Sequence, residues 1–479
     1  MPFLAGLTLT LAWGTFAFGA VYQWAYLPLA AACSALGVSG LLIGRRGARV
    51  PVMRPLIGAL TAMMAIGLLQ IVPMPEALIS SISPATDRFL RSYDLGYASA
   101  TAVVPAEPFA APAAWHPLSV DPPATMRALA LLGAFTLFLG GLLRAFTRYS
   151  PARAAWMLFA LGLALALVGI IQKAVLGDHA FGGMRIYGFW TPRYLLTTPF
   201  GPFVNKNHFA GWMLMGIPMA LGLLASSLSM AARATRPHLR DRLLWLSTPQ
   251  GGRFQLAVFG VTLMGLALLM TRSRSGIACF LLTVALTGVL AARGARGMRH
   301  GALTLGALLA ILTASLVWAG SDSPLTRVGS QSDSLQLRVD IWRDAIAIVS
   351  DFPLVGTGLN TFGTATVLYQ TSRPDLHFQE AHNDYLQLVV EGGLGLTLVI
   401  VFAVAATAWA IARRFRSRDD DEGSYWLRAG ATVGLIAVAL QSTVEFSLQM
   451  PGNAAVFVVL LAIALHWRQG PSSRDVTVS

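Results

Sequence analysis

Charged residues are scarce in this chain, and their scarcity excludes a soluble globular protein. Only 12% of the 479 residues are charged, whereas 55% are hydrophobic, and the mean hydropathy is +0.62. A soluble domain carries about 25% charged residues. With so little charge, most of the protein surface must face lipid, so the sequence predicts a membrane protein.

Cysteine is almost absent as well. The two cysteines, Cys33 and Cys279, both lie inside apolar runs. These positions exclude a disulfide framework in the polar loops and a zinc site made of cysteine ligands. We expect both thiols to pack as small core residues.

Sequence motifs for metal and nucleotide chemistry are also missing. The chain has no HExxH sequence, no cluster of Cys or His and no closely paired acids on its predicted outer side. Gly356-Thr357-Gly358 lacks the third glycine of a dinucleotide fingerprint and is interpreted as a turn. We therefore predict a protein without a metal site and without a cofactor.

Long apolar runs are what the chain has in abundance. A membrane span needs roughly 20 apolar residues, and about twelve such runs can be placed along the sequence by this measure. They lie near residues 3–22, 25–43, 55–73, 124–143, 154–176, 207–229, 254–271, 275–292, 301–319, 385–412, 428–447 and 452–467. The pattern predicts an all-α polytopic membrane protein with a single integral membrane domain over residues 1–479.

Basic and acidic residues fall on opposite sides of these runs. If the N-terminus lies inside, most of the 35 basic residues occupy inner loops and most of the 22 acidic residues occupy outer loops. This is the positive-inside pattern, and it predicts a multi-pass protein of the bacterial inner membrane. Anionic lipid headgroups account for the net charge of +13, so no nucleic-acid partner is expected.

Three predicted periplasmic loops are long enough to have structure of their own. The loop at 74–123 is rich in Pro and Ala, with one expected short helix at 85–93. The loop at 177–206 is expected to turn back at the membrane surface, as a re-entrant loop does. In the loop at 320–384, apolar residues with a 4,3,4,3 spacing predict a helix over 334–350 that ends before Pro353.

Arg272 and Arg274 stand between two adjacent apolar runs, so both guanidinium groups are predicted at the outer membrane surface. One interpretation is a pair of interfacial anchors. Anchoring arginines gather on the inner side, however, and charges near the membrane core tend to be functional. Because a guanidinium makes paired, charge-assisted hydrogen bonds to phosphate, the pair favours a phosphate-containing ligand.

His382 directly precedes the apolar run that begins near Tyr385, and Asn383 or Asp384 is expected to cap that helix. An imidazole held there could act as a base near pH 7, because its ordinary pKa is about 6.5. A structural hydrogen-bonding role is the alternative.

His208 is a second candidate at the start of an apolar run. It follows Asn205 and Asn207. These three side chains are expected either to cap the helix or to bind hydroxyl groups of an acceptor or glycan.

Five segments in this order resemble the superfamily of O-antigen ligases and polymerases, which are integral-membrane glycosyltransferases. They are Asn205–Gly211, Ser273–Gly276, Arg338–Ala345, Pro353–Gly358 and His382–Leu386, and the resemblance covers about residues 200–395. It implies a helical fold of the GT-C type with helical periplasmic loops. It also implies transfer of a glycan from undecaprenyl pyrophosphate to an acceptor hydroxyl, on the periplasmic face and without nucleotide or metal.

The resemblance also implies roles for individual residues. Arg274 matches the essential arginine of the family, Arg338 its second arginine and His382 its general base. Arg272 and Arg185 are further candidates for pyrophosphate binding. The implied reaction is an inverting displacement in which His382 takes the acceptor proton while the arginines neutralise the departing pyrophosphate.

The acceptor stays open at this point. A ligase attaches the glycan to lipid A core, a polymerase joins one lipid-linked chain to another, and a third type of transferase modifies protein serine; a ligase is the first expectation. A transporter or a flippase for lipid-linked glycan would suit the span count. Such proteins keep charges near mid-membrane, whereas Lys173 and Glu445 lie toward outer ends of the predicted runs.

Overall fold

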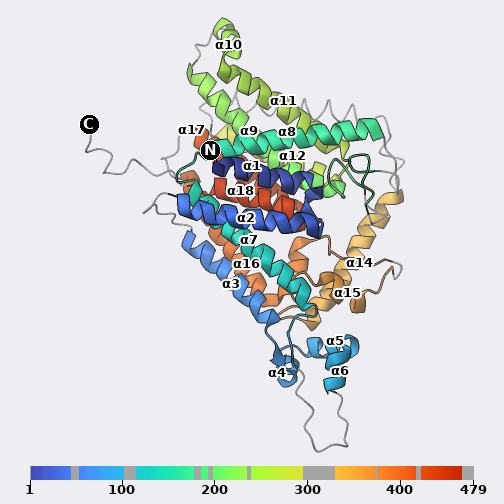
Figure 1. Ribbon diagram of the computed structural model, residues 1–479. Coiled ribbons are helices and arrows are strands. Elements are labelled where there is room, and N and C mark those ends of the chain that lie inside the picture. The colour runs from blue at the N-terminus through green and yellow to red at the C-terminus, as the bar shows by residue number, and fades with distance from the viewer. Residues whose placement is uncertain are drawn as a thin grey trace, which may run out of the picture.

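The computed structural model describes residues 2–44, 53–101, 115–176, 185–192, 198–234, 239–294, 329–373, 376–416 and 422–466. These residues are mostly helical (Figure 1). In this part of the chain the only strands are β1 (Met74–Pro75) and β2 (Trp115–His116), which pair antiparallel. The all-α architecture expected from the apolar runs is therefore confirmed.

Within the described ranges, eight helices are long and apolar enough to cross a membrane. They are α2 (Gln23–Ile43), α3 (Met53–Ile71), α7 (Pro122–Ala145), α8 (Pro151–Leu176), α9 (Lys206–Ala234), α11 (Pro249–Met270), α16 (Asp384–Arg416) and α17 (Glu422–Gln441). Shorter apolar helices are formed within α1 (Pro2–Phe16), α12 (Arg274–Gly294) and α18 (Pro451–Ala464). A short polar helix, α10 (Leu239–Leu246), precedes α11.

Eight of the expected spans are thus candidates among the described residues, and the count of about twelve stays a prediction. The expected run at 301–319 lies outside them. The runs at 3–22 and 452–467 form helices of 15 and 14 residues, which at 1.5 Å per residue reach only about 22 Å. Both helices are shorter than the hydrocarbon core of a bilayer, which is about 30 Å thick. Each helix ends before the expected apolar run does.

Helix α9 lies at the centre of the span bundle, and 83% of its apolar 18-residue stretch is buried. It packs against α8, α11, α12, α17 and α18. Helix α9 makes its most extensive contact with α17. At Gly430 of α17 the two backbones are so close that an added Cβ would lie 2.5 Å from the backbone oxygen of Pro218 in α9. Small residues let the two backbones touch, as is usual for helices packed in lipid.

A second hydrophobic core lies outside the span bundle. It joins α5 (Pro84–Tyr93) to α14 (Gly329–Asp351) and α15 (Phe362–Tyr369), with α4 (Glu76–Ile82) and α6 (Leu95–Thr101) beside them (Figure 1). The helices expected at 85–93 and 334–350 are confirmed as α5 and α14. As predicted, α14 ends at Asp351, before Pro353.

We call α4, α5, α6, α14 and α15 the outer layer. The segment at 353–358 connects this layer to the membrane-spanning helices. Gly393, with φ of +60°, interrupts α16, and the segment pairs with the opened backbone there. Leu394 N donates to Pro353 O at 2.8 Å, and Thr357 N donates to Val390 O at 2.9 Å. The backbone groups released by the break are thereby satisfied, which a lipid environment demands.

Gln70 of α3 completes the same joint. Its Nε2 donates to Val355 O at 2.7 Å and to Glu391 O at 2.8 Å, and its Oε1 accepts from Leu359 N at 3.2 Å. Gly356-Thr357-Gly358, interpreted as a turn, forms a bend at Thr357 between turns at 353–355 and 359–360. Both glycines have positive φ, +68° and +111°, and a Cβ at Gly356 would collide with the backbone of Glu391.

Candidate active site

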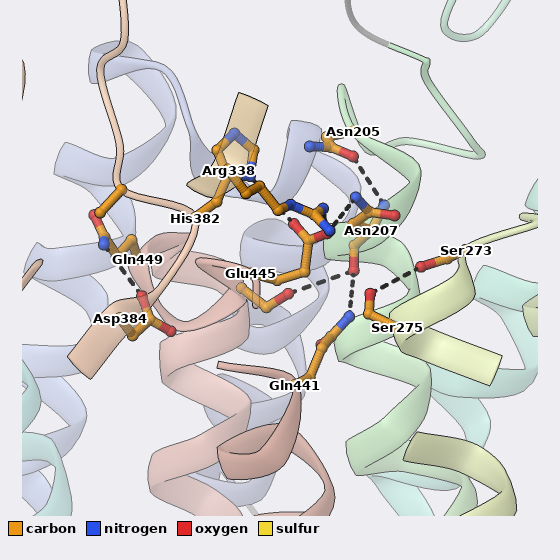
Figure 2. A network of polar contacts seen from close by, with 12 residues as sticks. Asn205, Asn207, Ser273, Ser275, Arg338, His382, Asp384, Gln441, Glu445 and Gln449 are labelled. Atoms are coloured by element: carbon orange, nitrogen blue, oxygen red, sulfur yellow. Dashed lines mark hydrogen bonds and ion pairs between the residues drawn. The ribbon is translucent and has the colours of Figure 1, made fainter. Parts of the chain in front are cut away.

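A single buried carboxylate, that of Glu445, lies at the centre of the candidate site. Glu445 stands between α17 and the 3-10 helix η3 (Ser447–Gln449), and its side chain is 1% exposed. One carboxylate oxygen, Oε1, accepts from Asn207 Nδ2 at 2.7 Å and from Arg338 Nη2 at 2.5 Å. The other, Oε2, lies 3.6 Å from His382 Nδ1 (Figure 2). Glu445 therefore joins α9, α14 and the segment that precedes α16.

Helix α14 positions two parts of this cluster. Arg338 reaches Glu445, and Trp342, one turn further along, donates from Nε1 to Ala381 O at 3.0 Å. Ala381 directly precedes His382 in the chain. The same face of α14 thus places the guanidinium and holds the backbone that carries the imidazole.

His382 adopts a left-handed backbone conformation, with φ of +51°. A non-glycine residue in this region is uncommon and is often found at functional sites. Asn383 caps α16, because its Oδ1 accepts from Tyr385 N and Leu386 N, both at 3.1 Å. Asp384 is fixed separately by Gln449 Nε2 at 3.1 Å. Of the two expected caps, the structure selects Asn383.

Asn205 and Asn207 act together at the start of α9. Asn205 Oδ1 accepts from Asn207 N at 2.9 Å, so this side chain is used in a cap-like turn. Asn207 instead directs its amide to Glu445, while its backbone oxygen accepts from Gln441 Nε2 at 3.1 Å. The structure therefore brings Asn207, but not Asn205, into direct contact with Glu445.

His208 is buried behind the site. It is 5% exposed, and its ring meets Phe446 edge to face with a centroid distance of 4.6 Å. The ring of Phe446 also meets His382 edge to face, with a centroid distance of 4.8 Å. His208 thus packs inside the protein, and its burial does not favour contact with an acceptor.

The turn that carries Arg272 and Arg274 flanks the site on the α9 side. Both arginines are exposed, and Arg272 has φ of +54°. The intervening Ser273 caps α12, because its Oγ accepts from Gly276 N at 3.2 Å. Gly276 packs closely on Ala210 of α9, and Ser273 and Ser275 lie beside Asn207 and Gln441 in Figure 2.

Arg185 is placed in a neighbouring turn instead. It is exposed, and its backbone oxygen accepts from Gly188 N at 3.3 Å. This turn packs on the end of α1 and the 3-10 helix η1 (Phe18–Ala20). Tyr187 Oη donates to Phe16 O at 2.6 Å, and the rings of Trp190 and Phe18 are 5.0 Å apart. The contacts of the turn thus lead away from Glu445.

Comparison with known families identifies the region around these residues. Residues 259–401 match the family model described as O-antigen ligase. This O-antigen ligase region begins in α11 and ends in α16, so it contains Arg272, Arg274, Arg338 and His382. This region is therefore similar to O-antigen ligases, and the match supports a membrane enzyme of the ligase or polymerase type. No curated protein matches the chain.

Glu445 lies outside the O-antigen ligase region, and the sequence analysis did not assign it a role. Its partners Asn207 and Arg338 are far away in the chain, so no local motif joins them. The available signal was an acid inside the apolar run at 428–447, where an ionisable group is costly.

Burial and nearby cations set the charge of Glu445. Burial alone would raise the pKa of this carboxyl group, but the approach of His382 and the charge of Arg338 outweigh it and bring the pKa below its ordinary value. Glu445 is therefore ionised at neutral pH. It presents a fixed negative charge to one guanidinium and one imidazole.

Glu380 shows the opposite shift two residues before His382. Burial raises its pKa to about 8, and the carboxylates of Glu391 and Asp384 act in the same direction. A hydrogen bond from Gln387 Nε2, at 2.6 Å, opposes this shift only in part. Near pH 7 the Glu380 side chain is mostly neutral.

The structure offers little to a metal ion at this place. Within the described ranges no group of three or more His, Cys, Asp and Glu side chains is arranged to hold one. Around Glu445 the partners are a guanidinium, an amide and an imidazole. The guanidinium is only a donor, and the imidazole can become cationic. Such groups suit an anionic ligand better than a metal ion.

Proposed function

We propose that this protein is a periplasmic glycosyltransferase that moves a glycan from undecaprenyl pyrophosphate to a hydroxyl group of lipid A core, as an O-antigen ligase does. The observation that carries the proposal is the meeting of Arg338 and His382 at Glu445, beside the turn of Arg272 and Arg274. These four cationic or basic residues all belong to the O-antigen ligase region. Together they provide one base and several phosphate-binding groups.

The proposed reaction is a direct displacement at the anomeric carbon. His382 takes the proton of the acceptor hydroxyl, and the hydroxyl oxygen forms the new glycosidic bond. The bond between the sugar and the pyrophosphate breaks on the opposite side, and its electron pair stays on the phosphate oxygen. Attack from the opposite side inverts the configuration of the sugar.

The arginines are proposed to stabilise the leaving group. Arg274 is the principal pyrophosphate ligand, with Arg272 and Arg338 beside it and Arg185 as an outer contributor. Their guanidinium groups supply the positive charge that a metal ion supplies in other phosphate-transfer sites. Preorganised donors of this kind are typically worth about 3 kcal/mol each in the transition state.

The orientation of the helices supports a periplasmic location. Helices α9, α12, α16 and α18 begin at the site, whereas α17 ends there. The far end of α16 carries Arg413, Arg414 and Arg416 in its last turn. By the positive-inside rule that basic end faces the cytoplasm, so the site opens on the other side of the inner membrane.

A deletion strain tests the proposal, complemented with wild-type protein or with Arg274→Ala, His382→Ala or Arg343→Ala. Arg343 is the matched control, because it lies on α14 but is 68% exposed and pairs only within its helix. We expect Arg274→Ala and His382→Ala each to lower glycan attachment by about 10²-fold or more. Arg343→Ala should restore attachment.

The glycolipids that accumulate identify the acceptor. Lipid A core without glycan, together with long lipid-linked glycan, supports the ligase. Accumulated single repeat units would identify a polymerase instead, and glycan trapped on the cytoplasmic side would identify a flippase. Normal glycan attachment with both Arg274→Ala and His382→Ala would contradict the proposed mechanism.

A further inference from the structure

Glu445 lies outside the O-antigen ligase region, yet it contacts Arg338 and His382 within that region. We infer that Glu445 is the positioning residue for His382: it holds the proton on Nδ1, so that the lone pair of Nε2 faces the acceptor hydroxyl. The inference rests on the proposed glycan transfer. It adds to that reaction a residue from outside the matched region.

The two facing atoms are complementary and have no other partner. Glu445 Oε2 and His382 Nδ1 are both buried, and neither makes another hydrogen bond among the described residues. Their separation of 3.6 Å exceeds the usual length of about 2.9 Å for such a bond. Catalytic hydrogen bonds are often long before substrate binds and shorten in the reactive complex.

The carboxylate is fixed from its other side. Oε1 is held by Asn207 from α9 and by Arg338 from α14. These two bonds come from separate helices, so they restrain rotation of the carboxylate and leave Oε2 directed at His382. An orienting group needs this kind of support to hold an imidazole in one tautomer.

The position of the imidazole favours Nε2 as the reactive atom. The side chain of His382 is 31% exposed, yet its Nδ1 is buried. The exposed part of the ring must therefore lie away from Nδ1, on the edges that include Nε2. Phe446 packs against the ring at 4.8 Å, and Trp342 holds the preceding carbonyl group.

The charges around the pair define its response to pH. Glu445 faces Arg338 from α14, His208 from α9, and His382, and Asp384 of α16 lies within electrostatic range. His382 also interacts with His208. When His382 takes the acceptor proton, Glu445 is the anion that stabilises the resulting imidazolium.

Glu445→Gln separates positioning from a merely structural role. The glutamine carbonyl can still accept from Asn207 and Arg338. The amide NH2 group, in place of Oε2, cannot accept a hydrogen bond from His382 Nδ1 and would instead donate one to it, which favours the wrong tautomer. A structural role is largely preserved by this substitution, whereas the positioning role is lost.

The experiment measures glycan transfer from the lipid-linked donor against pH, with purified full-length variants in lipid nanodiscs. For Glu445→Gln we expect kcat to fall by about 10²-fold or more with little change in KM for the donor. The acidic limb of the rate profile should move to lower pH, because the imidazolium has lost its neighbouring anion. Glu445→Asp keeps the anion and should recover part of kcat with the limb unmoved.

Glu76→Gln is the matched control. Glu76 is also a glutamate paired with an arginine, Arg91, but it lies in α4, away from the site. Its substitution should leave both kcat and the pH profile unchanged. If Glu445→Gln behaves like this control, or lowers kcat without moving the acidic limb, the positioning role is overturned.

A measurement on the wild-type protein covers the case in which the Gln variant does not fold. Nitrogen NMR of protein labelled at histidine reports the tautomer of His382, assigned by the signal missing from His382→Ala. We expect the proton on Nδ1 at neutral pH, and a proton on Nε2 would overturn the inference. A wild-type protein that transfers no lipid-linked glycan would instead refute the proposed function, and not the role of Glu445 alone.

Discussion

Two glutamates on either side of His382 show how the surroundings of single residues set their charge. Glu445 faces a guanidinium and an imidazole, and its pKa lies below the ordinary value despite its burial. Glu380 is half-buried near other carboxylates, and its desolvation raises its pKa to about 8. The same side chain is therefore an anion in one place and mostly a neutral acid in the other at pH 7.

The shift of Glu380 predicts how stability depends on pH. Its folded-state pKa exceeds the ordinary 4.5, so the folded state binds this proton more tightly than the unfolded state. The resulting stability is fully present below about pH 4.5 and is lost as pH rises to about 8. Glu380→Gln cannot ionise, so it should have nearly the wild-type Tm at about pH 5 and a higher Tm at about pH 9.

Thermal unfolding of both proteins in the same detergent measures this difference. The wild-type protein at the acidic pH serves as its own control, because Glu380 is then neutral. A difference in Tm that is equal at the two pH values would show that Glu380 is not the group responsible.

Local residue patterns predicted only part of the site. The cap formed by Asn383 and the base candidate His382 follow from their neighbours in the sequence, whereas the role of Arg338 was implied by the family resemblance. Glu445 could not be assigned in this way, because its role depends on the packing of α9, α14 and α17. The burial of His208 could not be predicted either, since only the folded protein shows its contacts with Phe446 and α18, and its role in binding an acceptor stays a prediction.

At the scale of elements, the joint between the 353–358 segment and α16 holds the site to the membrane. Gln70 serves three backbone groups there. Backbone groups left without partners in a buried place cost about 1–3 kcal/mol each. The joint thus depends strongly on one amide side chain.

Gln70→Ala should therefore lower the free energy of unfolding by about 2 kcal/mol or more, because it leaves Val355 O and Leu359 N unsatisfied, whereas Glu391 O keeps its bond from Gly358 N. Denaturant or thermal unfolding in detergent measures the loss. Gln255→Ala is the matched control, since the exposed Gln255 makes one such bond, to Leu246 O. Equal losses in the two variants would show that the joint does not depend on Gln70.

The elements themselves were largely predictable from apolar periodicity. Helices α5 and α14 were expected within a few residues of where they lie, and Pro353 marked the end of α14. The run at 3–22 was too long because Phe18, Gly19 and Ala20 all have positive φ and end α1 at Phe16. That turn is fixed by a distant contact, as a Cβ at Gly19 would lie 2.7 Å from Phe203, and no local pattern reports it.

At the scale of the whole molecule, the span bundle and the outer layer have separate hydrophobic cores, and the site lies where they meet. Glu445, Asn207 and His208 come from the spans and their connections, whereas Arg338 comes from the outer layer. The periplasmic side of the site stays a prediction from the charge distribution of the sequence. The convergence itself required the fold, because it joins elements from both halves of the chain.

The most direct test of the central claim is transfer by the purified protein in nanodiscs, supplied only with lipid-linked glycan and lipid A core, without nucleotide and with a metal chelator. We expect transfer with inversion at the anomeric carbon, lost in His382→Ala and Arg274→Ala. Absence of transfer by the wild-type protein, or transfer that needs a metal ion or is unchanged in both variants, would contradict the account.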